Sequence, residues 1–272
     1  QPNEKSARKI LDQASKNKVT VLDTAPVYGE AEETLGRIIK PTDNFKIITK
    51  THSITNKNLT HSPSTHIKKH FKDSLLRLRT NSIYGLLVHL SEDFLGPNGD
   101  DVWKTLTRLK LEGKTKYIGA SCYSPIDAKN ICERYPIEII QFPLNILDQS
   151  FITSGTIDYL ANKGVKIFTR STFLQGLLLM NPERLPNGFS SAKSSLRRFH
   201  NASRKLNLTP LELSLKFVAS IPNIKNIIVG VTQPSEMSEI FNALDTKLTE
   251  DFDFSTLAVR NESITNPSFW PP

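Results

Sequence analysis

Strand-like and helix-like patterns alternate along almost the whole chain, and this alternation restricts the fold more than any other feature. β-Branched and apolar runs bounded by turn residues predict strands in residues 19–25, 45–51, 81–90, 116–122, 137–145, 165–171 and 224–231. Apolar residues at helical spacing predict helices in residues 30–39, 62–78, 101–112, 125–134, 155–163, 194–206, 210–220 and 234–244. This regular alternation favours a parallel sheet covered by helices.

The expected strands are one fewer than the eight of a (β/α)8 TIM barrel, which is the α/β fold class that the pattern favours. The chain opens in an amphipathic helix at residues 4–17, so the absent strand would be the first. An open barrel would expose unpaired strand edges, which natural proteins avoid. We therefore expect further residues before Gln1. No repeat or linker interrupts the pattern, and residues 1–272 are expected to form a single barrel domain.

The composition narrows the classes of function. The chain is 38% apolar and 23% charged, as in a globular protein with a sizeable core, and no apolar run reaches the roughly 18 residues of a membrane span. Two cysteines, Cys122 and Cys132, make no disulfide framework, which favours a reducing cytoplasm. The net charge of +8 is scattered over helices, which favours an anionic small molecule over nucleic acid or membrane. The oligomeric state stays open, and a monomer is compatible with the sequence.

Each of the first three strand-like runs leads to an ionisable side chain. The first run ends at Asp23 and is followed by Tyr28, and the next two end at Lys50 and His89. Each residue alone has an ordinary structural explanation, such as a cap, a loop aromatic or a solvated strand end. The carboxyl ends of parallel strands meet at one edge of the sheet, where the active sites of such folds lie. The sequence therefore predicts that these four side chains gather there.

The four residue types form a proton-delivery group. A free phenol has a pKa of about 10, too high for efficient acid catalysis near neutrality. We expect the ammonium of Lys50 to lower the pKa of Tyr28, and Asp23 to keep Lys50 charged and oriented. The imidazole of His89 can direct a substrate carbonyl oxygen. Such a set suits carbonyl reduction, in which a cofactor delivers hydride to carbon while the phenol protonates oxygen.

These segments resemble the aldo-keto reductase superfamily, whose members are NAD(P)H-dependent oxidoreductases on a (β/α)8 barrel. The resemblance runs from the first helix almost to the end of the chain. It is carried by DTAPVYG at residues 23–29, by ETLG at residues 33–36, and by the two strands ending at Lys50 and His89. The resemblance implies that Tyr28 is the general acid, that Lys50 and Asp23 tune it, and that His89 orients the carbonyl.

The resemblance also implies a cofactor site. Ser121 and Gln141 match contacts to the nicotinamide carboxamide, and Cys122 replaces an Asn and is a poor donor. Arg170 and Ser171 stand where the family usually has Tyr-Ser, and the Arg plane could stack on the nicotinamide. The following segment, residues 173–178 with Leu174 and Gly176, matches a loop along the pyrophosphate.

A later segment matches the family's adenosine site, and it comprises Gly230, Thr232, Gln233, Met237 and Glu239. It lacks the Lys or Arg that often pairs with a 2′-phosphate. NADP(H) is favoured by the habit of the family alone, and NAD(H) is the alternative. No G-x-G-x-x-G occurs, which excludes a Rossmann fingerprint.

The expected function is cytoplasmic reduction of a small, polar aldehyde or ketone. Residues 170–180 resemble a bacterial branch associated with surface-sugar biosynthesis, which implies a sugar-derived carbonyl. Substrate choice is expected from the loops after His89 and Ser171 and from the tail, where Phe269 and Trp270 either line the pocket or plug the flank of the barrel.

Two other functions stay open. A Schiff-base aldolase could use Lys50 as its nucleophile, although Asp23 would keep that amine charged. A regulatory protein could bind the nicotinamide cofactor with little turnover.

A metal site is considered because His66 and His70 lie four apart on a helix, downstream of His61. No Cys or carboxylate joins them at ligand spacing, and a solvated basic helix face is favoured. Cys122 as a nucleophile has no supporting motif.

Overall fold

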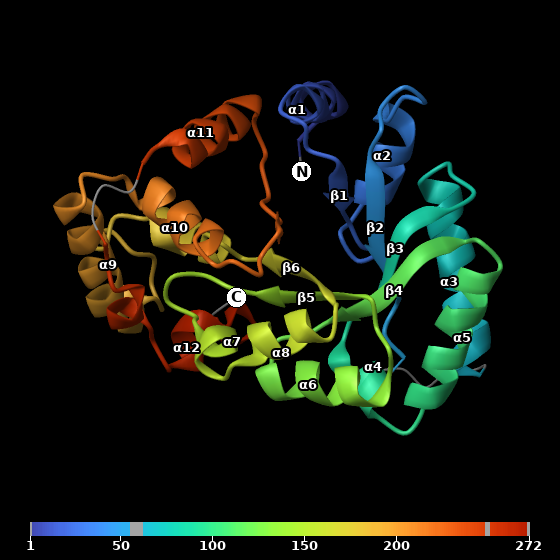
Figure 1. Ribbon diagram of the computed structural model, residues 1–272. Coiled ribbons are helices and arrows are strands. Elements are labelled where there is room, and N and C mark those ends of the chain that lie inside the picture. The colour runs from blue at the N-terminus through green and yellow to red at the C-terminus, as the bar shows by residue number, and fades with distance from the viewer. Residues whose placement is uncertain (1, 55–61, 248–250, 271–272) are drawn as a thin grey trace.

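In this computed structural model, residues 2–54, 62–247 and 251–270 are described. Within these residues, the strands form one sheet in which each strand is parallel to its neighbours and follows them in chain order. The strands are β1 (Val21–Asp23), β2 (Lys46–Lys50), β3 (Ile83–Val88), β4 (Thr115–Ser121), β5 (Ile139–Pro143), β6 (Lys166–Arg170) and β7 (Asn226–Ile227). Figure 1 shows that the sheet is curled and that helices lie along its outer side. The predicted parallel barrel architecture, one strand short, is confirmed.

Helices connect the successive strands. They are α1 (Glu4–Lys16), α2 (Ala31–Ile38), α3 (Pro63–Arg77), α4 (Ser91–Leu95), α5 (Gly99–Leu111), α6 (Pro125–Arg134), α7 (Ser150–Thr153), α8 (Thr156–Asn162), α9 (Lys193–Lys205), α10 (Pro210–Ala219), α11 (Pro234–Asp245) and α12 (Glu262–Thr265). Four short 3-10 helices are η1 (Leu174–Leu179), η2 (Ser190–Ala192), η3 (Phe254–Leu257) and η4 (Pro267–Phe269). Several starts carry the expected caps, because Ser62, Ser124 and Thr209 each accept a backbone N–H and precede a proline.

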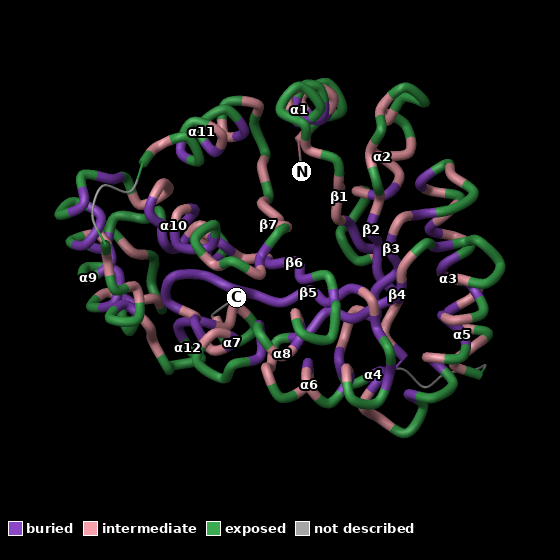
Figure 2. The backbone as a smooth tube through the Cα atoms, viewed as in Figure 1, coloured by how far each residue is buried: buried purple, intermediate pink, exposed green. Residues whose placement is uncertain are grey.

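The core lies on both faces of the sheet, whose central strands are almost entirely buried (Figure 2). A small cluster inside the curl is built from the sheet alone: Ile48, Leu87, Ile139 and Phe168. Leu86 and Val88, which alternate with Leu87 along β3, belong to the larger cluster shared with the helices. Alternate side chains of one strand therefore fill the barrel interior and the layer beneath the helices.

The sheet has a seam between β1 and β7. Within the described residues, β1 pairs with β2 and β7 pairs with β6, and the two edge strands do not pair with each other. The helices cover the seam, because Ile10 and Ala14 of α1 form a buried cluster with Met237 of α11. Figure 1 accordingly shows α1 between α11 and α2.

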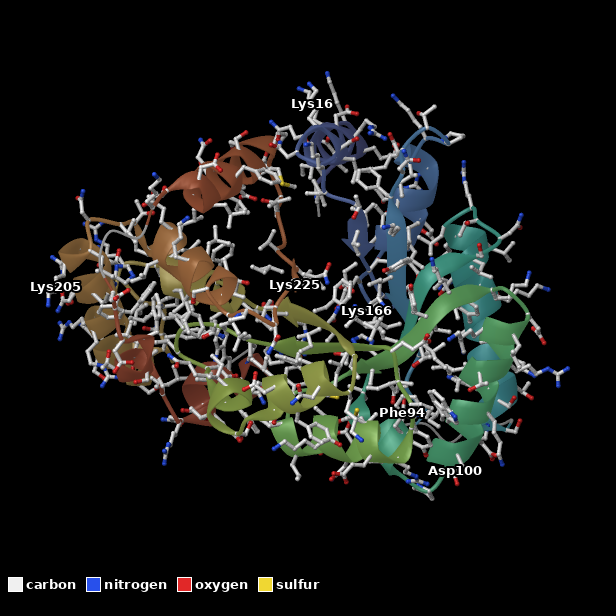
Figure 3. All side chains as sticks on the ribbon, in the orientation of Figure 1. Lys16, Phe94, Asp100, Lys166, Lys205 and Lys225 are labelled. Carbon is white, nitrogen blue, oxygen red and sulfur yellow. The ribbon has the colours of Figure 1, made fainter. Side chains whose placement is uncertain are left out.

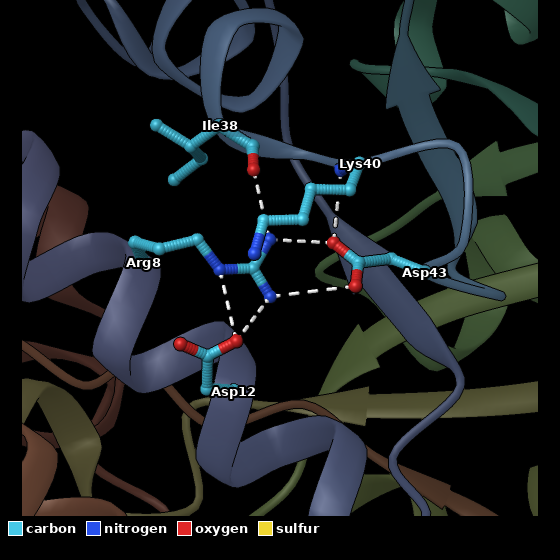
Figure 4. Close-up of polar contacts among 5 residues, drawn as sticks. All are labelled: Arg8, Asp12, Ile38, Lys40 and Asp43. Atoms are coloured by element: carbon cyan, nitrogen blue, oxygen red, sulfur yellow. Dashed lines mark hydrogen bonds and ion pairs between the residues drawn. The ribbon is translucent and has the colours of Figure 1, made fainter.

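Arg8 fastens α1 to the chain entering β2 (Figure 4). Its Nη1 donates to the Ile38 carbonyl at 2.8 Å and to Asp43 Oδ2 at 2.5 Å, and its Nη2 donates to Asp12 Oδ1 at 2.7 Å. The Lys40 N–H also donates to Asp43, and the hydrogen bond from Arg8 is the main cause that lowers the pKa of Asp43. These contacts fix α1 against the segment that connects α2 to β2.

Some sequence expectations fail locally. Residues 91–95 form helix α4 and not a loop, and the tail contains α12 with two 3-10 turns and is not irregular throughout. The last strand covers only Asn226 and Ile227, which are in register with Phe168 and Thr169 of β6, although the Ile228 N–H still donates to the Thr169 carbonyl at 2.7 Å. Leu76 of α3 is apolar but exposed. The polar loop expected at residues 56–62 lies almost wholly outside the described residues.

Lys16 on α1 and Lys205 on α9 lie at the periphery (Figure 3). Phe94 of α4 lies inward instead, and its ring meets those of Trp103 and Tyr135 at centroid distances of 6.2 and 5.0 Å. Within the described residues, no helix is both long and apolar enough to cross a membrane.

Gly36 allows α2 to approach the end of α3, and it provides a test of this packing. A Cβ at this position would lie 2.0 Å from the Arg77 carbonyl oxygen, which belongs to the backbone and cannot swing away. Alanine normally gains about 1 kcal/mol over glycine inside a helix. We expect Gly36→Ala to lower the free energy of unfolding instead, by about 1–3 kcal/mol, the usual cost of overpacking. Urea unfolding measures the change.

Gly230→Ala is the matched control, because a Cβ there would meet no atom within 4 Å. Its free energy of unfolding should stay within about 0.5 kcal/mol of wild type. A Gly36→Ala protein as stable as this control would contradict the packing.

Candidate active site

The candidate site occupies the interior face of the sheet at the carboxyl ends of the strands. Residues two apart on a strand point to the same face. The interior cluster contains Val21, Ile48, Leu87, Ile139 and Phe168. Two residues beyond them, strand by strand, stand Asp23, Lys50, His89, Gln141 and Arg170. Because residues two apart share a face, these five side chains form a polar layer just above the apolar interior.

A buried ion pair joins β1 to β2. Lys50 Nζ lies 2.9 and 2.8 Å from the two carboxylate oxygens of Asp23, and it donates to the Thr24 carbonyl at 3.0 Å. The side chains are 1% exposed for Lys50 and 9% for Asp23. Burial is the largest cause acting on the pKa of Lys50 and lowers it, while Asp23 acts in the opposite direction. Three acceptors thus hold the ammonium in one orientation.

Tyr28 lies above this pair. Its N–H donates to the Ala25 carbonyl at 3.0 Å, and Gly29 follows with φ of 58°, a left-handed conformation that favours glycine. This turn brings the Tyr28 ring to 5.1 Å from Lys50 Nζ and 6.0 Å from the His89 ring, which it meets edge-on. The predicted gathering of Asp23, Tyr28, Lys50 and His89 is therefore present in the fold.

The electrostatics of Tyr28 differ from the expectation. Burial and, second, Asp23 raise the pKa of Tyr28 to about 12, and Arg170 is the cation that lowers it. The predicted lowering by Lys50 is wrong for this structure. The reason is that Asp23 balances the ammonium at 2.8 Å, so little positive field from the pair reaches the phenol.

His89 is held in its neutral form. Burial, followed by Lys50, Arg170 and His52, lowers its pKa to about 4. At neutral pH the ring therefore has one N–H donor and one acceptor nitrogen.

Gln141 and Arg170 complete the interior layer. Gln141 Nε2 donates to Asp23 Oδ1 at 2.8 Å, a contact that the sequence did not indicate. Arg170 lies with its guanidinium carbon 4.2 Å from the centre of the Tyr123 ring, and its Nη1 is 3.4 Å from Ser171 Oγ. Tyr123 was missed as a site residue, although its position two residues after Ser121 was the available signal.

Ser121 and Cys122 face opposite sides of β4. Ser121 follows the interior alternation, whereas the Cys122 side chain is fully buried in the core beneath the helices, where burial raises the pKa of its thiol. The Cys122 N–H donates to the Gln141 carbonyl at 2.8 Å. The geometry therefore gives the Cys122 thiol neither a cofactor contact nor the reactivity of a nucleophile.

The loop after β6 is conformationally strained. Ser171, Leu174 and Gln175 have φ values of 62°, 47° and 53°, which side chains other than glycine rarely adopt, and Gly176 has 88°. The Leu174 side chain is buried, and the N–H groups of Leu174 and Gly176 donate to Ser171 and Phe173 carbonyls. Such strain often marks functional sites.

The expected adenosine segment follows β7 and leads into α11, on the other side of the seam from β1 (Figure 1). Gly230 has open space around it, and Thr232, Gln233 and Glu239 are exposed. The Thr232 N–H and the Gln233 N–H donate to Glu236 Oε2 at 2.6 and 3.2 Å, so a carboxylate caps α11 at this point.

The remaining candidates lie apart from the interior layer. The His66 and His70 rings contact each other at 4.3 Å, and His52 contacts His70 at 4.4 Å, so the helix face is partly covered instead of solvated. His61 lies outside the described residues. In the described part of the chain, no group of His, Cys, Asp or Glu has an arrangement that could hold a metal ion.

The two aromatic side chains of the tail lie in different environments. Trp270 packs edge-on against Phe189 at 4.9 Å and donates to the Ile264 carbonyl, whereas Phe269 is 61% exposed. These contacts of Trp270 favour the hypothesis that it closes the flank of the barrel over the hypothesis that it lines the substrate pocket.

A curled parallel sheet with an acid–base group at its carboxyl ends is the architecture of a barrel enzyme. The model of the aldo/keto reductase family matches residues 1–257 of the chain. The oxidoreductase YqkF of Bacillus subtilis is 26% identical over 265 residues, which cover 90% of this chain and 84% of YqkF. The NADH-specific methylglyoxal reductase of Escherichia coli is 24% identical over 267 residues, which cover 85% and 80%.

Among solved structures, the holo form of aldo-keto reductase AKR11C1 from Bacillus halodurans has the same fold. It aligns with a TM-score of 0.78 at 21% identity and covers 99% of this chain and 92% of that protein. The chain belongs to the aldo/keto reductase family, and it is an NAD(P)H-dependent oxidoreductase.

The buried pair predicts a large stability effect. Asp23→Asn would leave the Lys50 ammonium buried without its counter-ion, and breaking a buried pair in this way costs about 3–5 kcal/mol. We expect the free energy of unfolding in urea to fall by that order. The control is Glu4→Gln, which breaks the exposed pair between Glu4 and Arg37 and should cost no more than about 1 kcal/mol. Equal losses in the two variants would show that the pair is not buried in solution.

His89 predicts a specific dependence of stability on pH. Its folded pKa of about 4 lies below the unfolded value of about 6.5, so between these values the unfolded chain binds the extra proton. Stability from this residue is therefore full above pH 6.5 and is lost as the pH falls towards 4. Urea unfolding of wild type and His89→Gln at pH 7.5 and 4.5 measures it. The variant should lose less stability on acidification, and an identical loss would place His89 in contact with solvent.

Proposed function

We propose that this chain reduces a small aldehyde or ketone by hydride transfer, with Tyr28 as the general acid. One observation carries the proposal. The Lys50 ammonium, fixed by Asp23 and Thr24, lies 5.1 Å from the centre of the Tyr28 ring, and the His89 ring lies 6.0 Å from that ring and nearly perpendicular to it. A carbonyl oxygen between Tyr28 and His89 would meet two hydrogen-bond donors.

Each member has a distinct role in the proposal. Tyr28 keeps its proton at neutral pH because its pKa is raised to about 12, so it is in the form that an acid needs. His89, neutral because its pKa is about 4, directs an N–H to the same oxygen. Asp23 and Lys50 position the phenol and accommodate the charge that develops when its proton leaves.

The residues present fit a nicotinamide cofactor. Among the described residues, no group donates to Oε1 of Gln141, which is buried and could accept the N–H of a carboxamide. Ser121 and Ser171 would add hydroxyl contacts, and Arg170 would lie against the ring. When bound, the reduced nicotinamide supplies hydride to the carbonyl carbon. The strained loop with Leu174 and Gly176 would follow the pyrophosphate.

The adenosine segment bears on the choice of cofactor. Glu236 places a carboxylate beside Thr232 and Gln233, and neither of those residues is cationic. A 2′-phosphate would be repelled there. NADP(H) is the habit of the family, but these contacts support NAD(H) as an equal or better cofactor. Gly230 and Glu239 would flank the adenosine.

The substrate in the proposal is small and polar, and a sugar-derived carbonyl fits the resemblance of residues 170–180. Both cysteines are free, which supports a cytoplasmic location. We also propose that the catalytic unit is one domain. The aldolase alternative is poorly supported, because the Lys50 amine is buried and engaged by three acceptors and cannot reach a substrate carbonyl.

The proposal is tested by following the oxidation of the reduced cofactor through its absorbance. With NADH or NADPH and 4-nitrobenzaldehyde, wild type should oxidise the cofactor slowly but clearly. Tyr28→Phe removes only the hydroxyl and should lower kcat by at least about 100-fold, the usual scale for a general acid. Tyr159→Phe on α8 is the matched control and should keep wild-type turnover.

Other outcomes separate the alternatives. Equal turnover in Tyr28→Phe and wild type would reject Tyr28 as the acid. Tight cofactor binding with no turnover of any carbonyl would reject the reductase and support a regulatory protein. Trapping of Lys50 by borohydride in the presence of substrate would support the aldolase.

A further inference from the structure

The charges in the interior layer do not cancel. Asp23 and Lys50 neutralise each other at 2.8 Å, and Gln141 Nε2 donates a further hydrogen bond to the same carboxylate. His89 and Tyr28 are neutral near pH 7. Arg170 is left as a full positive charge with no counterpart in this layer.

The fold presents Arg170 to the site. It ends β6, where it is paired in register with Pro143, and it stands two residues after Phe168, which lies in the barrel interior. Its influence on the pKa values of Tyr28, Lys50 and His89 is consistent with a position beside the proton-delivering groups. Tyr123 supports one face of the guanidinium at 4.2 Å.

Arg170 is not explained as part of a structural ion pair. Within residues 2–54, 62–247 and 251–270, no carboxylate lies within ion-pair distance of its guanidinium, whose one hydrogen bond is the 3.4 Å contact with Ser171 Oγ. A guanidinium has five N–H donors in a planar fork. Most of them are therefore available to a ligand, and the fork matches the two oxygens of a carboxylate or phosphate.

We propose that Arg170 is a specificity-determining residue that selects carbonyl substrates bearing an anionic group, a carboxylate or a phosphate. The inference rests on the proposed reductase function and names its substrate class. In this proposal the oxygen to be protonated lies by Tyr28 and His89, and the anionic group of the same small molecule binds the Arg170 fork, which belongs to the same interior layer. Tyr123 holds the fork in place, which limits the side-chain entropy lost on binding.

The test compares matched substrates in the full chain. The first pair is 4-carboxybenzaldehyde and methyl 4-formylbenzoate, and the second is glyceraldehyde 3-phosphate and glyceraldehyde. Wild type should prefer the anionic member of at least one pair by about 10-fold or more in kcat/KM, the scale of one charge-assisted contact. The favoured pair distinguishes a carboxylate site from a phosphate site.

Arg170→Met should abolish the preference, mainly by raising KM for the anionic member. Arg170→Lys keeps the charge without the fork and should restore part of it. Arg198→Met, an equal loss of charge on the exposed face of α9, should keep the wild-type ratio. An unchanged ratio in Arg170→Met would overturn the proposal. If NADH binding also weakens in that case, the role of Arg170 is limited to its proposed contact with the nicotinamide.

Equilibrium binding separates this inference from the proposed function. Calorimetry measures the binding of benzoate and of benzamide to the cofactor-loaded protein, and this measurement does not depend on turnover. Tighter binding of benzoate in wild type, lost in Arg170→Met, would support the anion site even if no carbonyl is reduced. Equal binding of the two ligands in wild type would overturn it even if the reductase is active.

Discussion

The buried contact between Lys50 and Asp23 is the interaction on which the site depends. An ammonium removed from water costs several kcal/mol unless it is paired and hydrogen-bonded, and here two carboxylate oxygens and the Thr24 carbonyl supply the partners. The pair also joins β1, an edge strand, to β2. Tyr28 and His89 are arranged around it, so the geometry of the acid–base group follows from satisfying one buried charge.

The charge balance of that pair has a second consequence. Lys50 is not among the causes that shift the pKa of Tyr28, which is raised by burial and then by Asp23 and lowered by Arg170 of β6. Arg170 also acts to lower the pKa values of Lys50 and His89. The cation at the end of β6 therefore influences three of the ionisable groups at the carboxyl ends of the strands.

Much of the fold and the centre of the site could be predicted. Alternating patterns located the strands and helices, and the strand ends at Asp23, Lys50 and His89 identified the acid–base group. The short helix α4 was not predicted because Gly96 and Pro97 follow it closely and no side-chain cap marks its start, whereas Ser91, Asp93 and Phe94 are buried by tertiary packing. Cys122 was placed in the cofactor site from its neighbours, although its position one residue after Ser121 turns it to the opposite face.

The sequence alone determined the order of elements, the parallel sheet and the period of two that aims Asp23, Lys50, His89, Gln141 and Arg170 to one side, because these properties follow from local backbone geometry. The tertiary structure decided the rest. Only in the folded chain does Gln141 donate to Asp23 and does Arg170 lie against the Tyr123 ring. The Asp23 carboxylate neutralises the Lys50 ammonium there, and α1 and α11 cover the seam. Hydrogen bonds, burial and charge compensation depend on distances between strands far apart in sequence, and no local pattern contains those distances.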